Sequence, residues 1–156
     1  MFTALMKSVT ILLVLASVPL AQAGTILQYH HVSDQTPAAT SVTPAQFAHH
    51  LAMLEESGMQ VVRLDVLLDA AQAGDDTRDQ VAITFDDGYA NLAAHAMPLL
   101  AERGWPAAVF VTTSQVGGSD MLTLEQLEQI QGAGHLVLNH GREHEHVVRS
   151  LPGESR

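Results

Sequence analysis

The sequence predicts an α/β fold in which parallel strands alternate with helices. Short apolar runs recur along the chain, and each is followed by a stretch whose apolar residues have helical spacing. The runs are continuous and do not alternate with polar residues, as is typical of strands buried on both faces of a parallel sheet. Five strand–helix units follow from this pattern. They leave open whether the sheet stays open or closes into a barrel.

The first unit begins close to the N-terminus. Residues 25–30 are predicted as a strand because they are rich in β-forming side chains. Residues 33–41 combine Ser, Asp, Thr and Pro and are predicted as a loop. Thr43, Pro44 and Gln46 then match the start of a helix, with a threonine cap, a proline in the first turn and a glutamine placed to close a capping box.

The remaining units repeat this order of strand and helix. Gly58, Gly74 and Gly104 end three of the predicted helices, as glycine commonly does at a helix C-terminus. The later strands are predicted at residues 59–64, 81–85, 107–112 and 135–138. The later helices are predicted at residues 65–73, 91–103 and 123–131.

Residues 1–23 are predicted to be a secretory signal peptide that does not belong to the fold. Lys7 is the single charge before an apolar stretch at residues 9–20, and Ala-Gln-Ala at residues 21–23 supplies a cleavage site. The stretch is short for a membrane span, although an uncleaved anchor is the alternative. We therefore expect one domain at residues 24–156, exported to the periplasm or beyond, with no stable membrane span after cleavage.

The composition excludes several classes of function. The chain has a net charge of −10 and no basic cluster, which argues against nucleic acid as a partner. It contains no cysteine, so a thiolate nucleophile and a cysteine zinc site are excluded. Nine histidines are many for 156 residues. The composition gives no indication of an oligomeric state.

An acidic pair follows the apolar run at residues 81–85. Asp86, Asp87 and Gly88 come directly after it, at the strand end where parallel α/β folds carry their functional groups. Two adjacent carboxylates resist joint ionisation unless a cation or a donor intervenes. A metal ion bound by one carboxylate would leave the other to act as a base. The alternative is a plain Asp-Gly turn.

Two histidines follow the last predicted strand. His140 and His144 are four residues apart, so one helical turn would place them on the same face. Neutral imidazoles suit zinc, at about 2.0–2.1 Å. The alternative is a histidine-rich surface loop. Together with one carboxylate, the two imidazoles would leave coordination positions open, and this pattern predicts a metal-dependent hydrolase.

The two signals together resemble motifs of the polysaccharide deacetylases, the NodB-homology or carbohydrate esterase 4 family. Residues 84–88, TFDDG, resemble the first motif of that family, and residues 140–144, HGREH, resemble the second, His-Ser/Thr-x-x-His. Residues 27–34 and 41–47 are similar to the exported branch that deacetylates poly-β-1,6-N-acetylglucosamine. The resemblance implies a (β/α) barrel of the NodB type, of which this chain would form an incomplete, N-terminal part.

The resemblance also implies a role for each motif residue. Asp86 corresponds to the general base, and Asp87, His140 and His144 correspond to the ligands of a divalent metal, usually zinc. The implied reaction is the hydrolytic removal of N-acetyl groups from a polysaccharide that contains N-acetylglucosamine, releasing acetate and a free amine. At the end of the first strand, Tyr29 and His30 are weaker candidates for substrate binding.

Two departures from the family pattern define the alternatives. Gly141 stands where the family has Ser or Thr, which removes a side chain that supports the second motif. Twelve residues follow His144, too few for the later motifs, so we expect a domain truncated at its C-terminus with weak or no turnover. The alternative is a carbohydrate-binding or assembly module of the same fold. A metal-scavenging protein, suggested by the histidines, is another.

Overall fold

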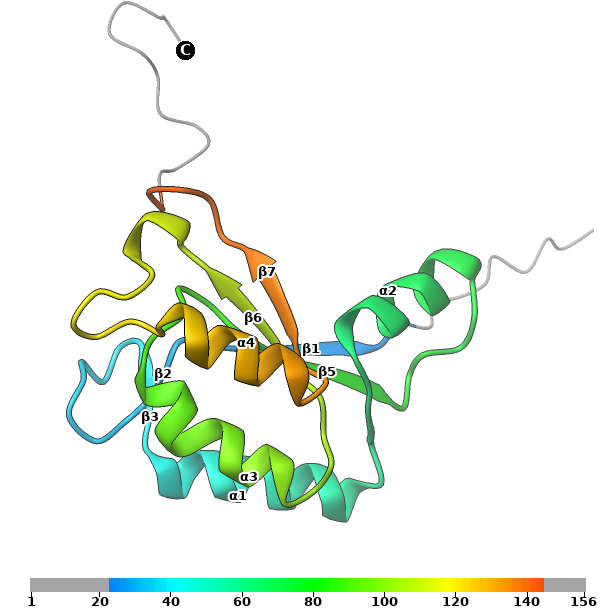
Figure 1. Cartoon of the computed structure of the whole chain (residues 1–156). Coiled ribbons are helices and arrows are strands. Elements are labelled where there is room, and N and C mark those ends of the chain that lie inside the picture. Colours follow the sequence, from blue (N-terminus) through cyan, green and yellow to red (C-terminus); the bar gives the residue numbers. More distant parts are fainter. Residues whose placement is uncertain (1–22, 145–156) are drawn as a thin grey trace, which may run out of the picture.

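A single sheet of parallel strands organises the computed structural model, which describes residues 23–144 (Figure 1). The strands run in the order β1-β5-β6-β7, and β4 also pairs with β5. All of these pairings are parallel, as the continuous apolar runs predicted. The strands are β1 (Thr25–Tyr29), β4 (Gln60–Val61), β5 (Gln80–Phe85), β6 (Ala108–Val111) and β7 (Leu136–Asn139). The prediction of an α/β fold is confirmed.

Helices connect the strands and lie mainly on one side of the sheet. Figure 1 shows α1, α3 and α4 grouped together, with α2 apart from them. The helices are α1 (Pro44–Ser57), α2 (Leu64–Ala73), α3 (Met97–Ala101) and α4 (Leu124–Gly132), and two short turns are η1 (Leu92–Ala96) and η2 (Thr113–Gln115). Parallel strands need such crossovers because the chain must return to the same end of the sheet before the next strand can begin.

The main core fills the space between the sheet and these grouped helices. Ile83 and Phe85 of β5 pack there with Phe47 of α1 and Leu100 of α3. Ala82, the residue before Ile83, belongs to the second core cluster, with Leu64 and Leu67 of α2. Alternate residues of a strand point to opposite faces, so β5 is buried on both. The same alternation sends Thr84 and Asp86 to the side of the sheet opposite the main core.

The start of α1 confirms the capping signal read from the sequence. Thr43 accepts a hydrogen bond from Gln46 N at 3.1 Å, and the Gln46 side chain accepts one from Thr43 N at 2.9 Å. The helix ends at Gly58, which has a φ of 72°. A second capping box, formed by Thr123 and Gln126, begins α4.

The segment predicted as one helix at residues 91–103 is divided. It begins as the π-helical turn η1 and continues as the short helix α3. Pro98 explains the difference, since it has no N–H to donate inside a regular helix. Met97 N instead bonds to Leu92 O, five residues back, which is the π-helical pattern.

Two further predictions needed correction. The strand expected at residues 59–64 is limited to β4, because α2 already begins at Leu64. Two short strands, β2 (His31–Val32) and β3 (Ser41–Val42), pair in parallel across the predicted loop. Within residues 23–144, no helix has the length and apolar character needed to cross a bilayer. The predicted signal peptide lies outside the described residues except for Ala23.

Candidate metal centre

Backbone geometry separates the two acidic side chains that follow β5. Asp86 still belongs to the sheet, because its N–H donates to Tyr29 O of β1 at 2.9 Å. Asp87 has a φ of 71° and Gly88 a φ of 83°, so the chain turns sharply there. A Cβ on Gly88 would lie 3.3 Å from a methyl group of Val111, which favours glycine in this turn. Both aspartates are buried, with exposed fractions of 7% and 8%.

The segment that carries the histidines is held against the turn after β6. His140 N donates to Val111 O at 2.9 Å, and Thr113 N and Ser114 N donate to the carbonyl oxygens of Gly141 and Arg142 at 3.1 and 3.0 Å. Gly141 has a φ of 83°, a conformation that glycine adopts without strain. The expected loss of support at Gly141 is therefore offset by backbone hydrogen bonds, which do not need a serine or threonine.

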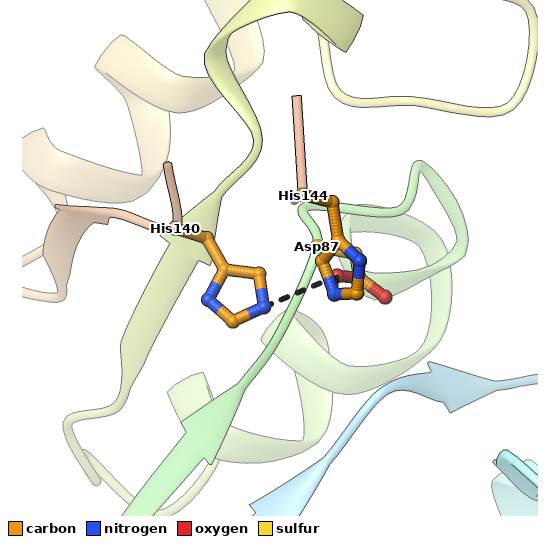
Figure 2. A group of neighbouring side chains, drawn as sticks. All are labelled: Asp87, His140 and His144. Atoms are coloured by element: carbon orange, nitrogen blue, oxygen red, sulfur yellow. Dashed lines mark ion pairs between the residues drawn. The ribbon is translucent and has the colours of Figure 1, made fainter. Parts of the chain in front are cut away.

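Asp87, His140 and His144 converge on one point (Figure 2). Asp87 Oδ1 lies 3.4 Å from His140 Nε2 and 3.3 Å from His144 Nε2. The centroids of the two imidazole rings are 5.0 Å apart. The spacing of the two histidines and the position of the acidic pair predicted this convergence.

The arrangement of these three atoms fits a divalent cation. Asp87 Oδ1 is buried and has no hydrogen-bond partner, which leaves a negative oxygen unsatisfied. Ligand atoms around a tetrahedral zinc ion, with bonds of about 2.0–2.1 Å, are separated by roughly 3.3 Å. The two distances from Asp87 Oδ1 match that separation. His144 is half exposed, so the centre is open to solvent on that side.

Asp86 lies beside this centre and faces a pocket. Its Oδ2 accepts a hydrogen bond from Gln28 Nε2 of β1. A pocket of about 280 Å³ lies here, and its lining includes Asp86, Gln28, Thr84 and His140. His140 therefore belongs both to the triad and to the pocket of Asp86. Sequence reasoning missed Gln28, because its partner is fixed only by the register in which β1 pairs with β5.

An aromatic pair supports the turn at Asp87. The ring of His31 stacks on Tyr89 with a centroid distance of 3.6 Å. Asn91 fixes this pair, since its Nδ2 contacts His31 Nδ1 at 2.9 Å and its Oδ1 accepts from Val32 N at 3.1 Å. Burial lowers the pKa of His31. Burial raises the pKa of Tyr89, and the neighbouring Asp87 raises it further.

The two weaker candidates lie at the end of β1. The ring of Tyr29 packs edge-on against Phe47 with centroids 5.1 Å apart, and its hydroxyl contacts His50 Nδ1 at 3.2 Å. Burial raises the pKa of the Tyr29 phenol. His30 and Tyr29 both line a smaller pocket of about 200 Å³, which also includes Thr40 and Ser41.

The fold and the triad define an α/β domain with a potential metal centre at the carboxyl ends of its strands. The profile of the polysaccharide deacetylase family matches residues 73–155, more than half of the chain. This chain therefore belongs to the polysaccharide deacetylase family.

Curated relatives agree with this assignment. YxkH of Bacillus subtilis strain 168, described as a polysaccharide deacetylase, is 29% identical over 120 residues, which cover 76% of this chain and 42% of YxkH. The poly-β-1,6-N-acetyl-D-glucosamine N-deacetylase of Escherichia coli strain K12 is 30% identical over 84 residues, 52% of this chain and 12% of that enzyme. The chain thus spans less than half the length of these relatives.

Solved structures share the fold. IcaB from Ammonifex degensii has a TM-score of 0.66 and 27% identity, over 74% of this chain and 52% of IcaB. The Streptococcus pyogenes deacetylase PplD, solved with acetate, has a TM-score of 0.73 and 23% identity, over 83% of this chain and 61% of PplD. The described strands and helices therefore correspond to an incomplete barrel of the NodB type.

Proposed function

We propose that this chain belongs to an exported, metal-dependent hydrolase that removes N-acetyl groups from a polysaccharide containing N-acetylglucosamine. The proposal depends on one observation, the convergence of Asp87, His140 and His144 beside the carboxylate of Asp86. The name of the Escherichia coli relative supports poly-β-1,6-N-acetylglucosamine as the substrate class.

In this proposal the triad holds the metal. Asp87, His140 and His144 would supply one oxygen and two nitrogen ligands, a set that suits zinc and leaves room for further ligands. A bound divalent cation would polarise the amide carbonyl as a Lewis acid and make the attacking water more acidic. The backbone hydrogen bonds at Gly141 and Arg142 would keep the histidines in place for this role.

Asp86 is the proposed general base. Its Oδ2 is held by Gln28, whereas its Oδ1 has no hydrogen bond within residues 23–144 and can take a proton. Asp86 would accept a proton from the water that attacks the acetamide carbonyl. The C–N bond then breaks as the proton held by Asp86 passes to the nitrogen, and acetate and an amino sugar leave.

The smaller pocket at the end of β1 is a proposed place for the sugar. It is lined by polar groups that include His30 and the hydroxyls of Thr40 and Ser41. Such groups can donate to and accept from sugar hydroxyls. Tyr29 would contribute mainly by packing, because its ring contacts Phe47 and Phe85.

Acetate release by the full chain tests this function. With added zinc, the wild-type chain is expected to deacetylate an oligomer of β-1,6-linked N-acetylglucosamine. Asp86→Asn is expected to lower the rate by about 10²-fold or more, since it removes the base, and to leave zinc affinity unchanged. Asp69→Asn, an exposed change on α2, is the matched control and should retain the wild-type rate.

Two results would contradict the proposal. One is a wild-type chain that binds zinc and the oligomer but releases no acetate, which would favour a carbohydrate-binding module. The other is an Asp86→Asn variant with the wild-type rate, which would remove Asp86 from the reaction. Zinc affinity by calorimetry and acetate release by an enzymatic assay are the measurements.

A further inference from the structure

The register between β1 and β5 places Gln28 next to Asp86. Gln28 pairs with Thr84, and Tyr29 pairs with Phe85, along the parallel ladder. The N–H of Asp86 extends this ladder by donating to Tyr29 O. The backbone positions of Gln28 and Asp86 are therefore fixed relative to each other by strand hydrogen bonds, although the two residues are 58 apart in the sequence.

The pleat of the two strands directs these side chains to the same face. Thr84 and Asp86 are two residues apart and point to the same side of the sheet. Gln28, opposite Thr84, lies on that side as well, and all three line the pocket that His140 also borders. The Gln28 amide thus meets the Asp86 carboxylate on the side of the metal centre, away from the main core.

No positively charged side chain takes this place within the described part of the chain. Its four arginines are paired with other acids: Arg63 with Asp65, Arg78 with Asp76, Arg103 with Glu55 and Glu102, and Arg142 with Glu143. Residues 23–144 contain no lysine. Gln28 is therefore the side-chain donor to Asp86 among these residues, and it is a neutral one.

We infer that Gln28 is a positioning residue for Asp86. Its amide holds Oδ2 of the carboxylate and so orients Oδ1 for proton transfer, without neutralising the negative charge. This inference rests on the proposed function, in which Asp86 is the base. A correctly placed base matters because a displacement of about 1 Å can cost a factor of about 10² in rate.

Kinetics of Gln28 variants test the role. Gln28→Met keeps the length of the side chain and removes the donor, so kcat is expected to fall by about 10- to 100-fold, with KM and zinc affinity unchanged. Gln28→Glu removes the donor and adds a like charge, so its kcat should be lower still. Gln28→Lys restores a donor of similar reach and should recover part of the kcat lost in Gln28→Met.

Gln60 supplies a matched control within the same chain. It lies on β4 and also donates through Nε2 to an aspartate, Asp79 Oδ2, at 2.8 Å. Gln60→Met therefore removes the same kind of hydrogen bond at an exposed position outside the pocket. Its kcat, KM and zinc affinity should equal those of the wild type.

A measurement without turnover tests the hydrogen bond itself. In a ¹H–¹⁵N spectrum, the side-chain amide signal of Gln28 is assigned by its loss in Gln28→Met. Asp86→Asn should shift this signal and leave the Gln60 amide signal in place. An unshifted Gln28 signal would overturn the inference.

The two proposals can fail separately. A wild-type chain that releases acetate while Gln28→Met keeps its full kcat would overturn the role of Gln28 and leave the proposed function standing. A wild-type chain that binds zinc and releases no acetate would overturn the proposed function. A Gln28→Lys variant with a kcat no higher than that of Gln28→Met would show that restoring a donor does not restore the rate, which would also overturn the role of Gln28.

Discussion

Asp86 and Asp87 are neighbours in the chain but occupy different environments. Asp86 continues the strand and accepts a hydrogen bond from the Gln28 side-chain amide. Asp87 instead has a left-handed backbone conformation, and its carboxylate contacts two imidazoles. Aspartate tolerates a positive φ better than most residues do, yet the conformation still costs about 1–3 kcal/mol. Strain of this kind is concentrated at functional sites, where the surrounding structure enforces it. At Asp87, the hydrogen bond from Thr112 N to its carbonyl oxygen helps to do so.

His135 is a buried residue whose protonation should affect stability. It is 7% exposed, and its Nδ1 accepts a hydrogen bond from Ala107 N at 3.0 Å, which requires that nitrogen to be unprotonated. Burial lowers the pKa of His135 below its ordinary value of 6.5. The unfolded chain therefore takes up a proton first as the pH falls, and the stability is full above pH 6.5 and decreases below it.

We predict that the free energy of unfolding decreases as the pH falls below 6.5 towards the lowered pKa of His135. His135→Asn should make this pH dependence shallower, because it removes the titrating group. The variant should also be less stable at pH 8 by about 1–3 kcal/mol if Asn does not reach Ala107 N. Urea denaturation across this pH range measures both effects. An unchanged slope in His135→Asn would exclude His135 as the source.

Capping boxes define where two of the helices begin. Thr43 with Gln46 and Thr123 with Gln126 each satisfy two backbone N–H groups that the first helical turn leaves without partners. The second box also matters for the site, because α4 leads into β7 and hence to His140. A fixed start of α4 helps to set the register in which β7 pairs with β6.

We predict that Thr123→Ala lowers the free energy of unfolding by about 1 kcal/mol. The side-chain oxygen of Thr123 accepts from Gln126 N at 3.2 Å, and alanine removes this acceptor. Thr123→Ser keeps the hydroxyl and should retain most of the stability. Thr40→Ala, in an exposed loop, is the control and should change stability by less than about 0.5 kcal/mol. Equal losses in all three variants, measured by urea denaturation, would contradict the capping role.

The elements were predictable to the extent that their signals are local. Caps and terminal glycines marked α1, and apolar runs marked β5, β6 and β7. The division of the third helix at Pro98 also had a local signal, which the helical spacing around it obscured. The pairing of β2 with β3 had none, since two-residue strands are defined by their partners.

The same distinction applies to the candidate site. The convergence of Asp87, His140 and His144 could be predicted because their residue types and spacings suit a metal site, and the structure brings the three side chains together. Gln28 was missed because its role depends on a strand register across 58 residues. The contacts of His31 also have no local signal, because its partners Tyr89 and Asn91 come from a distant segment.

At the scale of the whole molecule, the triad joins the ends of two strands that are not neighbours in the sheet. Asp87 follows β5 and the histidines follow β7, with β6 between these strands. The described residues carry four arginines and no lysine against a large excess of acidic groups, so the folded chain experiences net repulsion. A cation at the triad would join the strand ends and reduce the negative charge at a buried carboxylate.

We therefore predict that zinc raises the melting temperature of the full chain. A ligand that binds only the folded state at a free concentration of about 100 times its Kd adds about 2.7 kcal/mol. For a domain of this size that corresponds to a rise of roughly 10 °C. Thermal unfolding followed by circular dichroism, with zinc and then with excess EDTA, measures the rise and its reversal.

Three variants locate the origin of this stabilisation. His140→Ala should abolish the rise, because it removes a ligand, whereas Asp86→Asn should keep it, because Asp86 is not one of the converging atoms. His49→Ala removes an exposed histidine on α1 and serves as the control, with the full rise expected. An equal rise in His140→Ala and in the wild type would place zinc on other histidines and separate the triad from metal binding. Loss of the rise in Asp86→Asn would instead make both aspartates ligands and remove the base from the proposed reaction.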